Sequence, residues 1–225
     1  MWHDARAFTF GLGTVDPDEI AYSKSTALMT FLFGVEFSDC AVVLTRGDAS
    51  ASPPVRPKVY VAVRAKLCAK YIAPLVTAVD AANAAATGPE AAMLPAVVGV
   101  PIVGKTEAKG GDFAKDDATF EKLVKKIVAA GGAAAGGGKP VLATLAKEFS
   151  VDGDATGPVL ARWCARVVTE GGGADGSGAG ALLLVNGRVG CASALAVKDA
   201  EEITHIKKVS FLYLPLYFTR ILLTV

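Results

Sequence analysis

Short apolar runs alternate along the chain with longer segments in which apolar residues recur every three or four positions. Runs of four to eight apolar, β-branched residues are typical of strands. Six such runs are present: Ala7–Gly13, Cys40–Gly47, Lys58–Ala65, Val97–Gly104, Pro140–Leu145 and Ala181–Val185. Pro101 cannot donate to a strand ladder, so Val97–Gly104 is expected at an edge or a strand end. The unbroken apolar run Ala181–Val185 predicts a strand covered on both faces.

Helical spacing predicts elements between these strands. In Tyr22–Gly34, Ser23 or Ser25 can cap a helix and Gly34 can end it. The apolar positions expected to pack in this first helix are Leu28, Phe31 and Leu32. A second helix, Lys66–Ala86, is expected to kink or restart at Pro74. Its apolar side is Leu67, Tyr71, Ile72, Leu75, Val76 and Val79.

Three further helices are predicted in the second half of the chain. Asp116 or Asp117 opens one whose apolar stripe is Phe120, Leu123, Val124, Ile127 and Val128. Pro158 suits the first position of the next, and Gly171 its end. Its stripe is Leu160, Trp163, Cys164, Val167 and Val168. Asp199 precedes the last helix. Strands alternating with helices indicate an α/β protein, a three-layer α/β/α sandwich, over residues 1–198, followed by a C-terminal helix in residues 199–225.

Composition narrows the function classes. The chain has 225 residues, 52% hydrophobic and 20% charged, with a formal net charge of +1. This composition is too apolar for a disordered chain. The chain also lacks the excess of basic residues needed for nonspecific electrostatic binding to DNA or anionic lipid. Cys40, Cys68, Cys164 and Cys191 form no CxxC pair, so we expect four buried, reduced thiols in a reducing compartment. No signal peptide is apparent at the N-terminus.

Glycine-rich segments raise the possibility of nucleotide binding. They are Gly11–Asp16, Gly136–Pro140 and Gly171–Gly180. The first has Asp16 where the third glycine of GxGxxG would stand, and its carboxylate would face a pyrophosphate. In the second, Pro140 replaces the Ser or Thr that would bind magnesium. We interpret all three as loops.

Residues that could carry catalysis are sparse. His3 and His205 are the only histidines, and no HExxH or GxSxG motif occurs. The sequence therefore predicts no catalytic residue, no metal ligand and no cofactor site. Ser23–Thr26 places hydroxyls and Lys24 at a helix start, which suits either an anion site or a helix cap. The lysines of a short basic face are expected to be solvated: Lys115, Lys122, Lys125 and Lys126.

The terminal run Val209–Val225 is strongly apolar. Its 17 residues are fewer than the roughly 20 that span a bilayer, and Pro215 and Arg220 interrupt it. Three interpretations of this run stay open: a packed helix, an end that is foreign to the fold, and a tail anchor. For the chain as a whole, no membrane association is predicted.

Two blocks resemble a known family. Tyr22–Leu44 (YSKSTALMTFLFGVEFSDCAVVL) is similar to a block near the start of the large subunit of FACT, the nuclear histone chaperone. Leu195–Lys208 (LAVKDAEEITHIKK) resembles the family's junction to its next lobe, a motif also found in creatinase and aminopeptidase P relatives. The matching junction positions are Lys198, Glu202, Ile203, Lys207 and Lys208. Together the blocks extend the resemblance over about residues 2–208.

The resemblance implies the N-lobe of a peptidase-like module with a mixed β-sheet, creatinase/prolidase N-terminal domain-like and ribonuclease H-like. It implies a non-catalytic part of a chromatin complex in the nucleus, on chromosomes, acting in transcription, replication and repair. The implied partners are core histones and, through regions absent here, the second FACT subunit, without sequence-specific nucleic-acid recognition. The alternative is the accessory lobe of a creatinase-like metallopeptidase; a tail-anchored membrane protein is a third hypothesis.

The sequence also departs from the family pattern. The loops Asp48–Pro57, Ala81–Glu90 and Gly131–Gly138 are expanded, and the family's leading helix is missing. After Ser210 the resemblance ends, and the pita-bread lobe, the pleckstrin-like modules and the acidic tail do not follow. These departures suggest a truncated or mis-joined version of a longer protein.

Overall fold

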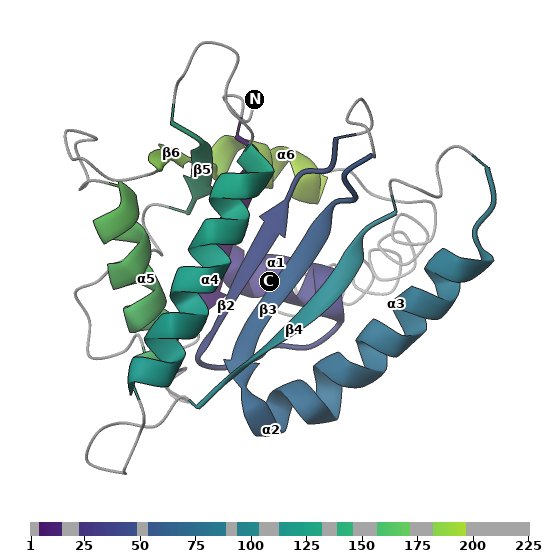
Figure 1. The fold of residues 1–225 in the computed structure, drawn as a ribbon, viewed down its shortest axis with the longest axis horizontal. Helices are drawn as coiled ribbons and strands as arrows, with labels where there is room; N and C mark the ends of the chain where they lie inside the picture. The colour runs from purple at the N-terminus through teal and green to yellow at the C-terminus, as the bar shows by residue number, and fades with distance from the viewer. Residues whose placement is uncertain are drawn as a thin grey trace, which may run out of the picture. The chain divides into compact units, whose positions relative to one another are not determined.

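A computed structural model shows how the predicted elements are arranged (Figure 1). It describes residues 5–14, 23–48, 54–88, 94–103, 113–131, 139–145, 157–171 and 182–196. The chain divides into two compact units, Met1–Val189 and Gly190–Val225. The sheet and all helices except the last lie within the first unit.

Six strands form one mixed sheet in the order β4-β3-β2-β1-β5-β6. β1 (Ala7–Leu12), β2 (Cys40–Thr45) and β3 (Lys58–Arg64) run antiparallel in sequence order. β4 (Ala96–Ile102) adds in parallel to β3, and β5 (Val141–Thr144) and β6 (Leu183–Asn186) add in parallel beyond β1. The α/β class and the mixed sheet expected from the sequence are thus confirmed.

The two edge strands test the strand predictions. β4, which contains Pro101, lies at one edge as expected. β6 lies at the other edge and is only partly covered, with Leu183 and Asn186 exposed, so the prediction of a strand buried on both faces is wrong. A continuous apolar run does not distinguish a central strand from an edge strand, because strand order depends on pairing between distant segments.

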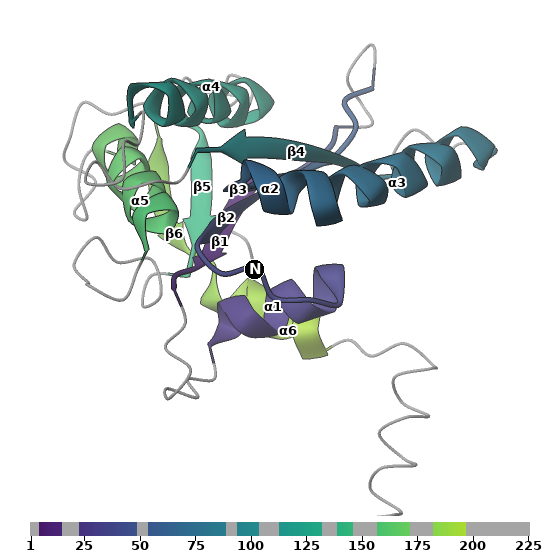
Figure 2. The same ribbon diagram turned by 90° about the horizontal axis from the view of Figure 1, so that it is seen from below.

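One face of the sheet packs against α4 (Phe113–Gly131) and α5 (Pro158–Gly171) (Figure 2). The two helices and the sheet residues beneath them form one buried cluster. Its helical members are Phe120, Leu123, Val124, Ile127, Val159, Leu160, Trp163, Cys164 and Val167. Both predicted apolar stripes therefore face the core, apart from the half-buried Val128 and Val168 at their ends. α4 starts at Phe113, earlier than predicted, and Asp116 in its first turn accepts from the Val103 N–H at 2.8 Å.

The opposite face carries α1 (Lys24–Phe33) and a broken helix along β3 and β4. That helix consists of α2 (Ala65–Leu67), a π-helical turn η1 (Cys68–Ile72) and α3 (Ala73–Ala85). Pro74 lies at the start of α3, directly after the π turn, where its missing N–H and its ring interrupt regular α-helical bonding. The restart predicted at Pro74 is confirmed. With α4 and α5 on the other side, the first unit has three layers.

The first helix has the predicted caps but not the predicted buried side. Ser23 is the N-cap, accepting from the Thr26 N–H at 2.9 Å, and Gly34 ends the helix in the left-handed conformation. Its buried residues are Ser25, Leu28 and Met29, whereas Phe31 is 51% exposed and Leu32 is also exposed. The prediction that Phe31 and Leu32 pack is therefore wrong.

Tyr71 of η1, also expected on a packed side, is exposed. The π turn inserts an extra residue and shifts the later positions around the helix axis, so a regular period assigns them to the wrong side.

α6 (Arg188–Ala196) was not predicted and spans the boundary between the two units. The predicted helix after Asp199, the domain boundary at residue 198 and the terminal run Val209–Val225 lie outside the described residues. Among the helices that the structure describes, none is long and apolar enough to cross a bilayer.

Candidate functional site

Asp39 joins three distant segments of the first unit. Its side chain is buried, and its Oδ1 accepts from the backbone N–H groups of Val159 (2.8 Å) and Leu160 (3.2 Å) at the start of α5. Its Oδ2 accepts from Arg64 at the end of β3, at 3.1 Å. The residue adopts a φ of 51°, which aspartate tolerates better than most residues. Asp39 thus caps a helix that starts about 120 residues later, and its charge is matched by Arg64 and by the positive end of α5.

Two glycines permit this close packing. A Cβ on Gly157, which has a φ of 65°, would come 2.6 Å from Asp39 Oδ1. A Cβ on Gly11 would collide with the Cys40 carbonyl oxygen and the Leu160 side chain. Gly11 and Leu12 belong to β1, so the interpretation of Gly11–Asp16 as a loop is wrong at its start. The absence of a side chain at Gly11 lets Leu160 of α5 pack against the strand. Gly171 ends α5, whereas the rest of Gly171–Gly180 and most of Gly136–Pro140 lie outside the described residues.

The cysteines are buried and free, as the sequence predicted. Burial raises the pKa of the Cys40 thiol and that of Cys164 to about 12, and it also raises the pKa of Cys68. Cys40 Sγ donates to the Phe37 carbonyl oxygen at 2.9 Å. Because the thiolate is the nucleophilic form, Cys40 and Cys164 are unreactive at neutral pH in the folded protein.

No catalytic or metal-binding cluster appears in the described part of the chain. No three His, Cys, Asp or Glu residues there are grouped so that they could hold a metal ion. His3 and His205 lie outside the described residues, as do the junction residues from Lys198 to Lys208.

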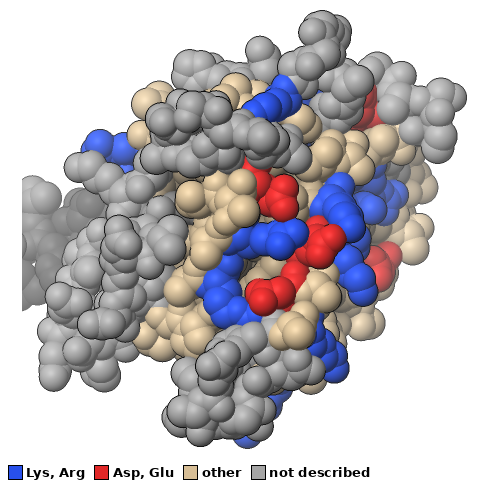
Figure 3. Space-filling model, turned by 60° about the vertical axis from the view of Figure 1, so that its left-hand side comes forward, with Lys and Arg blue, Asp and Glu red and all other residues tan. Residues whose placement is uncertain are grey.

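A charged surface covers α4 and α5 (Figure 3). Arg162 of α5 pairs with Asp116 at 3.2 Å and Asp117 at 2.6 Å on α4. One turn further, Arg166 pairs with Glu170 at 3.1 Å. Two more pairs complete the network, Arg166–Glu121 at 3.9 Å and Lys125–Glu121 at 2.7 Å. We call these seven residues the α4–α5 charged surface. Its positive and negative groups nearly balance, and Asp117 (58% exposed) and Glu121 (44%) present carboxylates to solvent.

The lysines singled out from the sequence all lie on α4 and are exposed, as expected, and Lys125 belongs to the charged surface. Lys125 is engaged by Glu121, and the Lys126 ammonium lies 5.2 Å from the centre of the Tyr60 ring. At the start of α1, Ser23 acts as a helix cap and its hydroxyl also lies 2.8 Å from that of Thr26. These contacts favour the cap interpretation of Ser23–Thr26 over the anion site.

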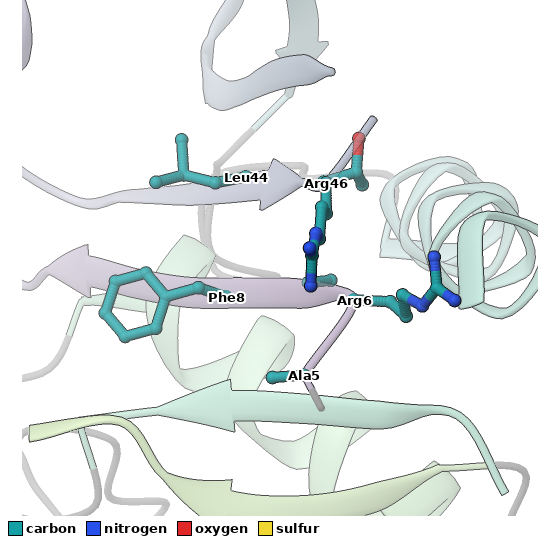
Figure 4. A pocket seen from close by; sticks show the side chains of 7 residues that line it. Ala5, Arg6, Phe8, Leu44 and Arg46 are labelled. Carbon is teal, nitrogen blue, oxygen red and sulfur yellow. The ribbon is translucent and has the colours of Figure 1, made fainter. Parts of the chain in front are cut away.

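A hollow of about 460 Å³ opens where β1 begins and β2 ends (Figure 4). Its lining residues are Ala5, Arg6, Ala7, Phe8, Leu44, Thr45 and Arg46. Phe8 and Leu44 lie at one end and Arg6 and Arg46 at the other. The arrangement combines an apolar wall with two guanidinium groups, which suits binding rather than bond-breaking.

Sequence reasoning missed Asp39, Arg162 and the two arginines of the hollow. Asp39 stands immediately before a strand, where no local pattern indicates that it caps a distant helix. Arg162 lies on the polar side of an amphipathic helix, where an arginine is ordinarily solvated. Arg6 and Arg46 are 40 positions apart, and only the pairing of β1 with β2 brings them together.

Comparison with known proteins finds solved structures with a similar architecture. The fold is an α/β structure with a mixed six-stranded sheet, and it is similar to the folds of two solved N-terminal domains. One similar solved structure is the N-terminal domain of FACT complex subunit SPT16 from Cicer arietinum (chickpea), at a TM-score of 0.56 and 17% identity. Another is the same domain from Eremothecium gossypii (Ashbya gossypii), at a TM-score of 0.56 and 19% identity. No protein-family model and no curated protein matches the sequence.

The matched region is nearly all of this chain but a smaller share of each solved chain. The comparison covers 98% of this chain and 41% of the chickpea chain, and 87% of this chain and 34% of the Eremothecium chain. This chain therefore spans well under half of the solved structures that it matches. At these identities the likeness establishes the fold, and it agrees with the family resemblance carried by Tyr22–Leu44.

Proposed function

We propose that this chain is a non-catalytic, FACT-type N-terminal module of a nuclear chromatin complex and that it binds core histones. The observation that carries the proposal is the structural likeness to the SPT16 N-terminal domain over nearly the whole chain. The KSTAL-type helix and the apolar strand after it, Tyr22–Leu44, support the same assignment from the sequence. Their counterparts in the structure are α1 and β2, next to the central strand β1.

The chemistry of the interior also supports a binding role. Asp39 has both carboxylate oxygens engaged, by α5 and by Arg64, so its charge serves the architecture of the fold. Cys40 and Cys164 are held as neutral thiols by burial, which raises the pKa of each to about 12. These groups contribute to stability, and binding is left to the surface. The second subunit of such a complex would be engaged by parts of the longer protein beyond this module.

The α4–α5 charged surface is the part of the module that we assign to histone contact. The most exposed carboxylates of this surface belong to Asp117 and Glu121. Asp117 pairs with Arg162, and Glu121 pairs with Arg166 and Lys125. Histones are rich in lysine and arginine, and a basic partner can join such a network by sharing carboxylate oxygens. The contact would be salt-sensitive, since exposed charges are screened within about 8 Å at physiological ionic strength.

The test is retention of purified core histones on the immobilised 225-residue chain at about 150 mM salt. We expect retention by the native chain and a severalfold loss in the double variant Asp117→Lys with Glu121→Lys. Asp80→Lys, on the exposed side of α3, reverses one charge away from this surface, and its matched comparison is the single variant Asp117→Lys, which changes the net charge equally. Absence of retention by the native chain would contradict the function. Equal retention by native chain and double variant would contradict the surface assignment only.

A further inference from the structure

Two arginines stand opposite each other at one end of the sheet. β1 and β2 are antiparallel, and their register pairs Ala7 with Thr45 and Phe8 with Leu44. One step further along the same register, Arg6 faces Arg46, and the Arg46 N–H donates to the Arg6 carbonyl oxygen at 2.7 Å. Like charges directly across two paired strands repel each other and destabilise the pair. An anion within reach of both guanidinium groups would reduce this repulsion.

Among the described residues, this pair of arginines is neutralised only in part. Arg6 Nη1 lies 3.8 Å from Asp48 Oδ2, a long contact between side chains that are 42% and 38% exposed. An exposed ion pair of this kind is weak in water. Arg46 is exposed, and no acidic side chain within the described ranges forms an ion pair with it. Counted over the described residues alone, positive charge exceeds negative charge at this end of the sheet.

The same two arginines line the hollow, whose other end is apolar. Phe8 and Leu44 are cross-strand partners. Phe8 follows Arg6 by two positions and Leu44 precedes Arg46 by two, so all four side chains lie on one face of the sheet. The volume of about 460 Å³ lies in the range in which protein pockets hold small ligands or parts of peptides. A ligand that fills the hollow would place apolar groups against Phe8 and Leu44 and negative groups beside Arg6 and Arg46 (Figure 4).

We propose that this hollow is a docking site for an acidic peptide segment of a partner protein, with an apolar side chain in the hollow and flanking carboxylates on Arg6 and Arg46. Guanidinium groups bind carboxylates through paired hydrogen bonds. A nucleic acid fits less well, because its affinity rises with the number of phosphates neutralised, and this site offers two cations beside an apolar wall. The partner is of opposite charge to a histone, so this proposal stands apart from the proposed function.

The test is fluorescence polarisation of a labelled nine-residue peptide with one phenylalanine between aspartates, titrated with the full 225-residue chain. We expect saturable binding that Arg46→Glu weakens at least about tenfold, since one charge-assisted contact contributes about that factor in affinity. Arg46 is exposed, so this variant should fold, which thermal unfolding can verify. Arg46→Lys keeps the charge but not the fork of donors and should lose less.

Lys122→Glu, an exposed position on α4, changes the net charge as much as Arg46→Glu does and should leave binding unchanged. A peptide with alanine in place of phenylalanine should bind several times more weakly, and one with lysines in place of aspartates should not bind. Equal losses in Arg46→Glu and Lys122→Glu would overturn the proposal, because they would indicate a general charge effect. So would displacement by inorganic phosphate together with indifference to the phenylalanine, which would indicate a simple anion site.

Discussion

The two faces of the sheet are packed differently. Over one face, α4 and α5 bury continuous apolar stripes around Trp163, which is fully buried, and the Phe120 and Trp163 rings lie 5.5 Å apart. Over the other face, α1 buries Leu28 and Met29 but leaves Phe31 exposed, and α3 has no fully buried residue. The sheet side chains on that face are nevertheless buried, Phe10 and Val61 among them, so the two faces differ in how much of each covering helix is buried.

The difference lies in the distribution of polar residues within each helix. In α4 and α5, charged residues occupy one side and leave a single side to bury. In α1 and α3, small or apolar residues surround the helix, so the burial of one side is set by the neighbouring elements. We infer that α4 and α5 bury more apolar side chains than α1 and α3 do, and that α1 leaves Phe31 exposed.

The largest expected effect is the loss of Trp163. Its indole N–H donates to Thr9 Oγ1 at 2.9 Å, and the Thr9 hydroxyl in turn donates to the Val42 carbonyl oxygen at 2.9 Å. Trp163→Ala removes a fully buried ring and should lower the free energy of unfolding by about 3–5 kcal/mol. Urea denaturation followed by far-UV circular dichroism measures the change. Trp163→Phe, which loses mainly the hydrogen bond, should cost about 1–2 kcal/mol; similar losses in both would contradict the packing argument.

Asp39→Ala should have the next largest effect. The substitution removes the acceptor for two N–H groups at the start of α5 and leaves Arg64 without its partner, so we expect a loss of about 2 kcal/mol. Thermal unfolding measures it. Asp39→Asn tolerates the positive φ and keeps an acceptor oxygen, so it should lose less. If the alanine variant is as stable as the native chain, α5 does not depend on this cap.

Alkaline pH should weaken both faces through their buried thiols. Burial raises the pKa of Cys40 and of Cys164 from 9.0 to about 12. The unfolded chain loses these protons first, so the stabilisation is complete below pH 9 and is lost as the pH rises towards 12. At pH 10 each thiol should account for about 1 kcal/mol of lost stability.

Urea denaturation at pH 8 and pH 10 measures this loss. Cys164→Ala and Cys40→Ala should each show a smaller decrease than the native chain. An identical decrease in a variant and in the native chain would show that other groups cause the alkaline effect.

The smallest effect is expected at the exposed end of α1. Phe31→Ser changes a side chain that is half in water and should alter the free energy of unfolding by no more than about 0.5 kcal/mol. On the same helix, Leu28→Ala should cost about 2 kcal/mol or more, because Leu28 is buried. Guanidinium denaturation compares the two, and a large loss in Phe31→Ser would show that Phe31 contributes to packing despite its exposure.

The prediction of helices and strands from sequence succeeded where local chemistry is decisive. Ser23 and Gly34 bound α1 because a hydroxyl cap and a left-handed glycine act within one turn. Pro74 marks the start of α3 because the missing N–H acts on its own helix. The prediction failed at Tyr71, where one π turn rotates the pattern, and at β6, where an apolar run lies at an edge.

The candidate binding surfaces were less predictable. The α4–α5 charged surface depends on the packing of two helices more than 25 residues apart, so Arg162 and Asp117 are unremarkable as separate residues. The resemblance carried by Tyr22–Leu44 indicated the fold and suggested the partner class, but it assigned no contact residue. Lysines counted along α4 proved to be partly engaged within the molecule, as Lys125 is by Glu121.

By itself the sequence determined which segments become strands and helices and which side of α4 and α5 is buried, because periodicity, caps and proline act over a few residues. Only the tertiary structure decided that Asp39 caps α5, that β6 is an edge strand and that Arg6 faces Arg46 across the sheet. Those outcomes depend on the pairing and packing of segments far apart in the chain, and no local pattern encodes which distant partner a residue will meet.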